Sequence, residues 1–377
     1  MRSGRDSADV PDPGAPPAPR SNPELLGHAA AESALRRLFD SGRLPHALLL
    51  SGPRGIGKAT LAFRLARFVL ANGGGEGAPG GLFGDSGPAI TGLEIAPESG
   101  VFHRVASGGH ADLLTVERAY DPRRRRLRGE IVVVDTREIA TFLRLTPAEG
   151  GWRVVIVDGA DEMNRNAANA LLKILEEPPR RALLLLVAHS PGRLLPTIRS
   201  RCRRFPLAPL APTIVRELLV RYRPDLPESQ AEALTALSGG SIGRALDLAA
   251  AGGVELYEAV LALLAREPGI DPAALHAFAD RLARGDAEEA YRAVEELMAQ
   301  LLARVAGAAA RGNTGAAPPS TAHESAVLQR LGHRAPAARW AELRDEIGRL
   351  FARTDALNLD KKQTILGAFF AIEGAAR

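Results

Sequence analysis

Residues 44–60 read LPHALLLSGPRGIGKAT, and this stretch decides the fold of the N-terminal half of the chain. The apolar run Ala47–Leu50 predicts a short buried strand, bounded by the glycines that follow it. From Lys58 to Leu70 the apolar residues recur at helical spacing, which predicts a helix directly after the glycines. Strand, glycine loop and helix, in this order, form the local context in which a backbone binds phosphate.

The loop between the predicted strand and helix is a candidate nucleotide site. Gly52, Gly55 and Gly57 allow the backbone to turn sharply, so that its N–H groups converge on an anion. The start of the helix adds about half a positive charge, and the ammonium of Lys58 adds a full one. The expected ligand is ATP or ADP. The alternative interpretation is a glycine turn that merely precedes a helix.

One position of this loop departs from the usual motif. The residue after the lysine is normally Ser or Thr, whose hydroxyl binds Mg²⁺. Here it is Ala59, and Thr60 follows one residue later. Because a helix turns by about 100° per residue, Thr60 does not take the place of that hydroxyl without a shift in register. Phosphate binding is therefore expected at Gly52–Thr60, while the placement of Mg²⁺ stays open.

The stretch RVVIVDGADEMN, residues 153–164, also departs from the sequence of an active ATPase, and this departure too argues against hydrolysis. It predicts a buried strand that ends at Asp158, the usual position of a metal-associated acid. An ATPase of this type carries a glutamate next to that acid to orient the attacking water, and this chain has Gly159. Nothing in the spacing aims Asp161 or Glu162 at a phosphate. We therefore expect no strong hydrolysis by this chain itself; the alternative interpretation is a solvated Asp-Gly turn.

The order of predicted elements indicates an α/β fold with a mostly parallel sheet, because strands alternate with helices. Beyond the elements above, we predict strands at Ile131–Val134 and Leu183–Val187, a helix at Asn164–Glu177 and a long surface excursion over most of residues 72–107. From Pro212 onward only helical patterns remain. The predicted organisation is a disordered tail (1–21), an α/β domain (22–208), a small helical domain (209–252) and a larger helical domain (253–377).

The bulk composition excludes some classes of protein. The formal net charge is +4, which permits contact with nucleic acid without requiring it. The single cysteine, Cys202, excludes an internal disulfide and a four-cysteine zinc site, as expected for a reducing compartment. Neither a signal peptide nor a run of about 18 apolar residues is present. We therefore expect a soluble cytoplasmic protein without a membrane partner.

Two stretches closely resemble the subunits of bacterial sliding-clamp loaders, which are proteins of the AAA+ type. They are NAANALLKILEEPP (Asn166–Pro179) and LLLLVAHSPGRLLPTIRSRCRRF (Leu183–Phe205), with the family's Leu-Glu-Glu-Pro-Pro and Ser200-Arg201-Cys202 signatures. The resemblance covers roughly residues 22–250. It implies that the two helical domains are a lid and an oligomerisation collar. NLDKKQTILGAFF (Asn358–Phe370) is similar to the collar end of alphaproteobacterial members.

Within that family, Ala59 and Gly159 resemble the delta-prime branch of DNA polymerase III rather than the ATP-hydrolysing gamma/tau branch. The resemblance implies a fixed member of a pentameric ring with gamma/tau and delta subunits, acting on the sliding clamp and primed DNA. The alternatives are a gamma/tau-type motor subunit and, from another class, a P-loop phosphotransferase. Many relatives carry a four-cysteine zinc module where residues 72–109 of this chain have no cysteine, so zinc is expected to be absent.

The resemblance also assigns roles to two arginines. Arg201 would reach into the ATP site of a neighbouring subunit and stabilise charge on the transferring phosphoryl group; the alternative is a contact with solvent or an internal carboxylate. Arg244, in GGSIGRAL (Gly239–Leu246), would act as a second sensor that binds a nucleotide phosphate, the alternative being an exposed helix residue. Ala188, His189 and Ser190 occupy the first-sensor region, where active relatives often place Thr.

Three further features leave alternatives open. Cys202 is interpreted as a small buried residue rather than a nucleophile, because no His partner is indicated. Glu176 and Glu177 lie at the anion-disfavouring end of their predicted helix, which suggests a partner such as an arginine or a neighbouring subunit, although solvent exposure is the preferred interpretation. The basic cluster Arg123–Arg128 either contacts DNA phosphates or forms a solvated hairpin.

Overall fold

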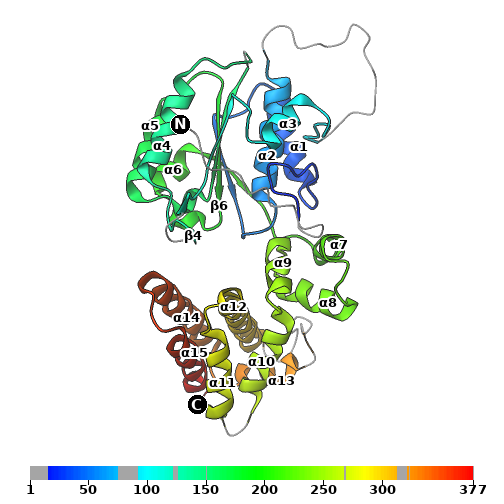
Figure 1. The fold of residues 1–377 in the computed structure, drawn as a ribbon, viewed down its shortest axis with the longest axis vertical. Helices are drawn as coiled ribbons and strands as arrows, with labels where there is room; N and C mark the ends of the chain where they lie inside the picture. Colours follow the sequence, from blue (N-terminus) through cyan, green and yellow to red (C-terminus); the bar gives the residue numbers. More distant parts are fainter. Residues whose placement is uncertain are drawn as a thin grey trace. The chain divides into compact units, whose positions relative to one another are not determined.

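The computed structural model describes residues 16–74, 92–121, 126–149, 151–266, 269–311, 321 and 323–376 (Figure 1). The chain divides into two compact units, Met1–Ile214 and Val215–Arg377. The first unit corresponds to the predicted α/β domain and extends slightly beyond its predicted end at residue 208. The further division of the helical half at about residue 253 stays a prediction.

A five-stranded sheet forms the centre of the first unit. Its strands follow the order β2 (Leu113–Val116), β5 (Arg153–Asp158), β6 (Ala182–Ala188), β1 (Ala47–Ser51) and β7 (Arg203–Pro206), and every neighbouring pair is parallel. β1 lies between β6 and β7, with Leu48 opposite both Leu185 and Arg203. The predicted fold class, a parallel α/β sheet followed by helices, is confirmed.

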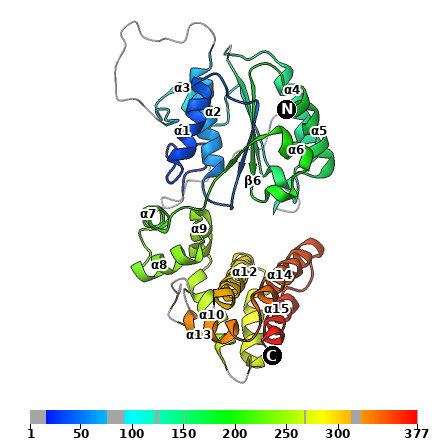
Figure 2. The same ribbon diagram turned by 180° about the vertical axis from the view of Figure 1, so that it is seen from behind.

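Helices cover both faces of this sheet (Figures 1 and 2). Along each strand successive side chains point to opposite faces. Leu48, Leu50 and Ile156 join one core with α1 (Ala29–Asp40), α2 (Lys58–Asn72) and α3 (Gly100–Ala106). Leu49, Val155 and Leu184 join the other core with α4 (Val133–Arg144), α5 (Arg165–Glu176) and α6 (Pro196–Arg201). Burial on both faces explains why these strands read as continuous apolar runs.

Two buried arginines of α2 hold α1 and the segment that precedes it. Arg67 is 2% exposed, and its guanidinium donates to the carbonyl oxygens of Arg20 at 2.8 Å and of Asn22 at 2.6 Å. The guanidinium of Arg64 pairs with the buried carboxylate of Glu32 at 2.5 Å. Residues 1–15 of the predicted tail lie outside the described residues, whereas the backbone at Arg20 is held by these contacts.

One prediction of local structure is wrong, and a second is contradicted over residues 100–106 only. Ile131–Val134 was expected to be a strand, but Ile131 forms only an isolated bridge to Met163, and α4 begins at Val133. The carboxylate of Asp135 accepts the N–H of Val132 at 2.9 Å, so this β-branched stretch is capped as a helix start. Within the predicted excursion 72–107, α3 begins where the side chain of Ser99 accepts the N–H of Phe102. Residues 75–91 of that excursion lie outside the described residues.

Small elements complete the first unit. The short 3₁₀ turns η1 (Ala160–Glu162) and η2 (Pro191–Arg193) follow β5 and β6. The strands β3 (Tyr120–Asp121) and β4 (Arg126–Leu127) pair antiparallel. Residues 122–125, which include the first three arginines of the predicted basic cluster, lie outside the described residues, and contact of that cluster with DNA stays a prediction.

The second unit contains helices and no strand among the residues that the structure describes, as predicted from Pro212 onward. Its helices are α7 (Pro212–Tyr222, which begins in the first unit), α8 (Glu228–Leu237), α9 (Ile242–Ala250), α10 (Gly253–Ala265), α11 (Pro272–Leu282), α12 (Glu288–Arg311), α13 (Glu324–Gly332), α14 (Ala337–Leu357) and α15 (Lys361–Ala375). Within the described part, no single helix is long and apolar enough to cross a membrane; α9 and α10 meet that test only jointly, across a 79° bend.

Candidate functional site

The glycine loop joins β1 to α2 in a conformation that favours glycine at three points. Gly52 has φ 146°, and a Cβ built there would lie 2.5 Å from the carbonyl oxygen of Leu207. Gly57 is the N-cap of α2 with φ 102°. Gly55 is also left-handed, at φ 75°. The loop therefore approaches its surroundings more closely than side chains allow, and it leads directly to a helix N-terminus, the arrangement that binds anions.

Lys58 is the first residue of α2 and is nearly fully buried, at 3% exposure. Its ammonium donates to the carbonyl oxygen of Pro53 within the same loop. Burial lowers the pKa of Lys58 to about 8, the nearby carboxylates of Asp158 and Asp161 oppose this shift, and the guanidinium of Arg54 adds to it. The loop thus holds its cation in a desolvated position, where interaction with a phosphate is stronger than in water.

The magnesium position of the loop is incomplete. Ala59 has no oxygen to offer, and Thr60, one residue further along α2, is buried at 8% exposure. The loop therefore fits a phosphate group but does not supply the hydroxyl that usually binds Mg²⁺. Among the described residues, no group of three or more His, Cys, Asp or Glu side chains is arranged to hold a metal ion.

Asp158 ends β5 as predicted, on the strand two places from β1. Burial raises the pKa of its carboxyl group, Glu117 adds to the rise, and the Lys58 ammonium lowers it. The next residue, Gly159, has φ 79°, and a Cβ there would lie 2.6 Å from Oε2 of Glu162. The position that carries the catalytic glutamate in an active ATPase is therefore shaped for glycine in this chain.

The two acids that follow Gly159 are occupied by structural contacts. The carboxylate of Asp161 accepts the backbone N–H of His189 at 3.0 Å and that of Ser190 at 2.7 Å. Glu162 pairs with Arg118 at 2.9 Å. Asp161 thus joins the end of β5 to the end of β6. Sequence reasoning missed this contact because it depends on the neighbouring position of the two strands, which no local pattern shows.

Two histidines lie near the loop, and only His28 was missed by sequence reasoning, because His189 had been placed in the first-sensor region. The Nε2 atom of His28 lies 2.7 Å from the carbonyl oxygen of Ile56, a contact that fixes the loop from the segment before α1. In the first-sensor region, burial lowers the pKa of His189 to about 4, and the Lys58 ammonium contributes to the shift. His189 is therefore neutral near pH 7. An isolated histidine such as His28 carries no spacing signal in the sequence.

Arg201 lies at the C-terminal end of α6, and its guanidinium donates to Oε1 of Glu176 at 2.7 Å. Both side chains are partly exposed, at 36% and 49%. The next residue, Cys202, is buried in the core beneath the sheet, where burial raises its pKa to about 11. The interpretation of Cys202 as a buried residue is confirmed. Glu176 is exposed, as the preferred interpretation had it, and it also has an arginine partner.

Arg244 belongs to the second unit, in the first turn of α9. Its backbone N–H is capped by the side chain of Ser241 at 3.1 Å, and its guanidinium contacts the carboxylate of Glu296 at 3.1 Å. Burial lowers the pKa of Arg244. Its predicted contact with a nucleotide phosphate stays a prediction, as do the roles of the loop residues and Arg201.

The sequence of this chain is similar to those of several known proteins. A family model described as "DNA polymerase III, delta subunit" matches residues 93–211. DNA polymerase III subunit delta' of Pseudomonas aeruginosa is 40% identical over 200 residues, which are 52% of this chain and 53% of the relative. The chain resembles DNA polymerase III subunits. Subunit gamma/tau of Mycobacterium bovis is 30% identical over 287 residues, 74% of this chain and 46% of the relative.

The chain therefore spans about half the length of the curated relatives that it matches. Among solved structures, a DNA polymerase III gamma subunit-related protein from Thermotoga maritima is 18% identical, with a TM-score of 0.37, over 91% of this chain and 99% of that one. The matched family model includes β5, α5 and α6, and hence Asp158, Gly159 and Arg201. The likeness of residues 358–370 to alphaproteobacterial chains stays a prediction.

Proposed function

We propose that this chain is a delta'-type subunit of a DNA polymerase III clamp loader, a stator that helps to load the sliding clamp onto primed DNA. The observation that carries the proposal is that the chain has a phosphate loop but lacks the catalytic glutamate at the end of β5. Gly52–Lys58 can cradle a phosphate, whereas Gly159 replaces the glutamate, and Asp161 is bound to the N–H groups of His189 and Ser190.

In this proposal the chain binds ATP or ADP and does not hydrolyse it efficiently. The loop N–H groups, the N-terminus of α2 and Lys58 hold the phosphates. Asp158 remains as the acid at the end of β5, but no side chain of this turn is free to orient water. The absence of a hydroxyl at Ala59 also disfavours hydrolysis.

Arg201 would act in trans, on ATP bound to a neighbouring gamma/tau subunit. Its position supports this role, because Cys202 anchors the end of α6 in the core while the guanidinium remains partly exposed. A guanidinium placed against the transferring phosphoryl group stabilises its negative charge, and arginines supplied in trans increase rates by about 10³–10⁵-fold. The pair with Glu176 would hold Arg201 extended until a neighbour replaces the carboxylate.

The helical half of the chain would serve assembly with the other subunits. The helices from about Gly253 would form a collar with the gamma/tau and delta subunits in a pentameric ring, and α8 and α9 would form a lid in which Arg244 contacts nucleotide. The clamp and primed DNA would be reached through the complex. A cytoplasmic location follows from that role. The 40% identity to a delta' subunit supports this assignment over half of the chain.

A second candidate is a gamma/tau-type motor subunit. The specific observation in its favour is that the match to gamma/tau extends over 74% of this chain, further than the match to delta'. Ala59 and the left-handed Gly159 oppose it, because a motor needs both the hydroxyl and the glutamate at these positions. The delta' assignment therefore takes precedence.

The test is ATP turnover by the isolated chain and by the complex reconstituted with its gamma/tau and delta partners. Arg201→Ala is compared with Arg204→Ala, which removes the same charge from an exposed position nearby. We expect no significant turnover by the isolated chain, and strong turnover by the complex that falls by about 10³-fold or more only with Arg201→Ala. Brisk turnover by the isolated chain would instead make it a motor subunit.

A further inference from the structure

His28 is the residue directly before α1, and its side chain lies against the glycine loop. The imidazole is buried, at 6% exposure, and its Nε2 atom lies 2.7 Å from the carbonyl oxygen of Ile56. Burial lowers the pKa of His28, against the opposing effects of the Ile56 hydrogen bond and of Glu32, so the ring is neutral near pH 7. Because a carbonyl oxygen only accepts hydrogen bonds, the single ring proton is on Nε2 and is donated to Ile56.

This hydrogen bond sets the direction of the next N–H group in the loop. In a planar trans peptide unit the C=O of one residue and the N–H of the following residue point in opposite directions. The carbonyl of Ile56 points toward His28, so the N–H of Gly57 points away from it. Within the part of the chain that the structure describes, the N–H of Gly57 donates to no backbone carbonyl. It is therefore available to an anion at the start of α2.

The loop backbone alone does not fix this orientation. Gly57 has φ 102°, and glycine populates positive and negative φ about equally, so the peptide before it can turn over at little cost. A Cβ at Gly57 would lie 2.8 Å from Cδ1 of Leu25 and 3.7 Å from Cδ2 of His28, which excludes a bulkier residue that would restrict φ. A donor outside the loop is thus needed to select one orientation, and His28 supplies it.

α1 contacts α2 at a second place that has a different consequence. The carboxylate of Glu32, one helical turn after His28, pairs with the guanidinium of Arg64. Arg64 lies within α2 rather than in the loop, so this pair holds the two helices together without orienting a loop peptide. The two residues of α1 therefore separate the packing of α1 from the positioning of the loop, and Glu32 provides a matched control for His28.

We propose that His28 is a positioning residue for the glycine loop: its Nε2–H holds the Ile56 carbonyl and thereby keeps the Gly57 N–H turned toward the phosphates of a bound nucleoside diphosphate or triphosphate. The proposal rests on the nucleotide binding proposed above and adds the side chain that orients the loop for it. His28 itself does not touch the nucleotide in this arrangement. Its effect is transmitted through one peptide unit, from the carbonyl that it binds to the N–H that the phosphate accepts.

Substitutions of His28 separate the donor from the bulk of the ring. The dissociation constant for ADP is measured on the full-length chain by isothermal titration. His28→Leu keeps an apolar side chain in the buried position and removes the donor, so it should weaken ADP binding by about tenfold or more. His28→Gln keeps an N–H donor at a similar reach and should bind ADP within about threefold of wild type. His28→Asn is too short to reach Ile56 and should behave like His28→Leu, which maintains the test if the leucine variant does not fold.

A spectroscopic signature reports on the peptide itself. The chain contains three Ile-Gly pairs, Ile56–Gly57, Ile242–Gly243 and Ile347–Gly348. Isoleucine labelled with ¹³C at the carbonyl and glycine labelled with ¹⁵N therefore give one cross-peak for each pair in an HNCO spectrum, and Ile56→Val assigns the first by deleting it. In the ADP-free chain His28→Leu should move this cross-peak and leave that of Ile347–Gly348 in place. ADP should move it in wild type.

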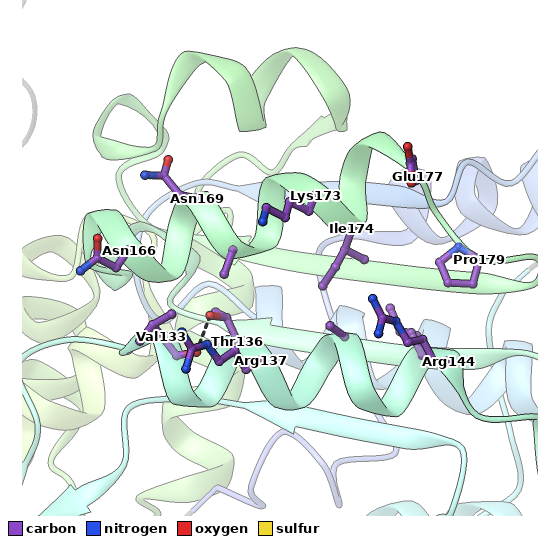
Figure 3. A pocket seen from close by; sticks show the side chains of 13 residues that line it. Val133, Thr136, Arg137, Arg144, Asn166, Asn169, Lys173, Ile174, Glu177 and Pro179 are labelled. Carbon is purple, nitrogen blue, oxygen red and sulfur yellow. Dashed lines mark hydrogen bonds between the residues drawn. The ribbon is translucent and has the colours of Figure 1, made fainter.

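Two control variants distinguish positioning from stability and from general attraction of anions. Glu32→Gln breaks the buried pair with Arg64, so it should lower the melting temperature but leave the Ile56–Gly57 cross-peak and the ADP affinity unchanged. Lys173→Gln removes an exposed cation from a groove between α4 and α5 (Figure 3), on the opposite face of the sheet from Ile56. It should not change the affinity for ADP.

The failures of the two proposals are distinguishable. Wild type that does not bind ADP would overturn nucleotide binding by this chain, and the role of His28 with it. If wild type binds ADP and His28→Leu binds it equally well, only the role of His28 is overturned. An equal loss of affinity in His28→Leu and His28→Gln would also overturn it, because the bulk of the ring rather than the donor would then be what matters. So would a loss in Glu32→Gln as large as that in His28→Leu.

Discussion

The guanidinium of Arg201 donates to Oε1 of Glu176 across 2.7 Å, which joins the end of α6 to the end of α5. Both side chains are partly exposed, and exposed ion pairs contribute about 0–1 kcal/mol to stability. The contact therefore orients Arg201 without locking it in place. In the proposed function Arg201 would exchange this carboxylate for a neighbour's phosphate, and a weak partner would permit that exchange.

Glu176→Gln tests that reasoning. Loss of an exposed pair should lower the free energy of unfolding by less than about 1 kcal/mol. Turnover by the reconstituted complex should remain within roughly threefold of wild type, because Arg201 keeps its charge. Thermal unfolding and ATP turnover measure the two effects. If turnover falls as far as in Arg201→Ala, Glu176 takes a direct part in the shared site.

The lowered pKa of Lys58 predicts a pH dependence of nucleotide binding. Below about pH 8 the ammonium is charged, and above it the group loses its proton while the protein is ligand-free. The dissociation constant for ADP should therefore depend little on Lys58 well below pH 8 and rise above it by at most tenfold per pH unit. Isothermal titration at several pH values measures it. Lys58→Met should bind weakly at every pH and show no such rise.

The lowered pKa of Lys58 also makes the free energy of unfolding depend on pH. The folded chain binds fewer protons at Lys58 than the unfolded chain between about pH 8 and the ordinary value of 10.5. The free energy of unfolding should therefore gain a contribution that increases with pH across this window. Chemical denaturation of wild type and Lys58→Met isolates the contribution, since the difference between the two curves would be flat without it.

Local patterns predicted the parts of the fold whose signals are contiguous. β1, β5 and β6 are built around apolar runs, and α5 begins directly after Asn164, whose side chain accepts the N–H of Ala167. β7 was missed because Arg203–Pro206 carries charges and becomes a strand only by pairing with β1. The residues of the loop could be named in advance. The contacts of Asp161 and Arg201 could not, because they join elements whose adjacency the sequence does not encode locally.

Asp161→Ala should destabilise the first unit. Asp161 is buried, at 7% exposure, and its carboxylate accepts two backbone N–H groups. The variant would leave these N–H groups without their partner. The expected loss in unfolding free energy is about 2 kcal/mol or more. Glu162→Ala, in the same turn, removes only a partly exposed pair with Arg118 and should cost less than about 1 kcal/mol. Urea denaturation of both variants gives the comparison, and equal losses would contradict it.

Tyr257→Phe should destabilise the second unit. The hydroxyl of Tyr257 donates to the fully buried carboxylate of Glu324 at 2.6 Å, and Arg304 pairs with the same carboxylate at 2.5 Å. A hydrogen bond to a buried charge contributes about 1.5–3 kcal/mol, so a loss of that order is expected by chemical denaturation. Tyr120→Phe is the control, because Tyr120 is 57% exposed. A smaller loss from Tyr257→Phe than from the control would show that the buried contact is dispensable.

Gly159→Glu restores the residue type that an active ATPase carries after Asp158, and we expect it to fail. The backbone has φ 79° and ψ 44° at this position, a left-handed conformation that costs a side-chain-bearing residue about 1–2 kcal/mol. The new Cβ would also displace the carboxylate of Glu162, which pairs with Arg118. Because Ala59 still lacks a hydroxyl, the variant should gain no ATP turnover and should melt at a lower temperature than wild type. Gly159→Asn serves as the control, since asparagine tolerates this conformation better. A Gly159→Glu chain as stable as wild type that hydrolyses ATP would show that the glycine alone had silenced the site.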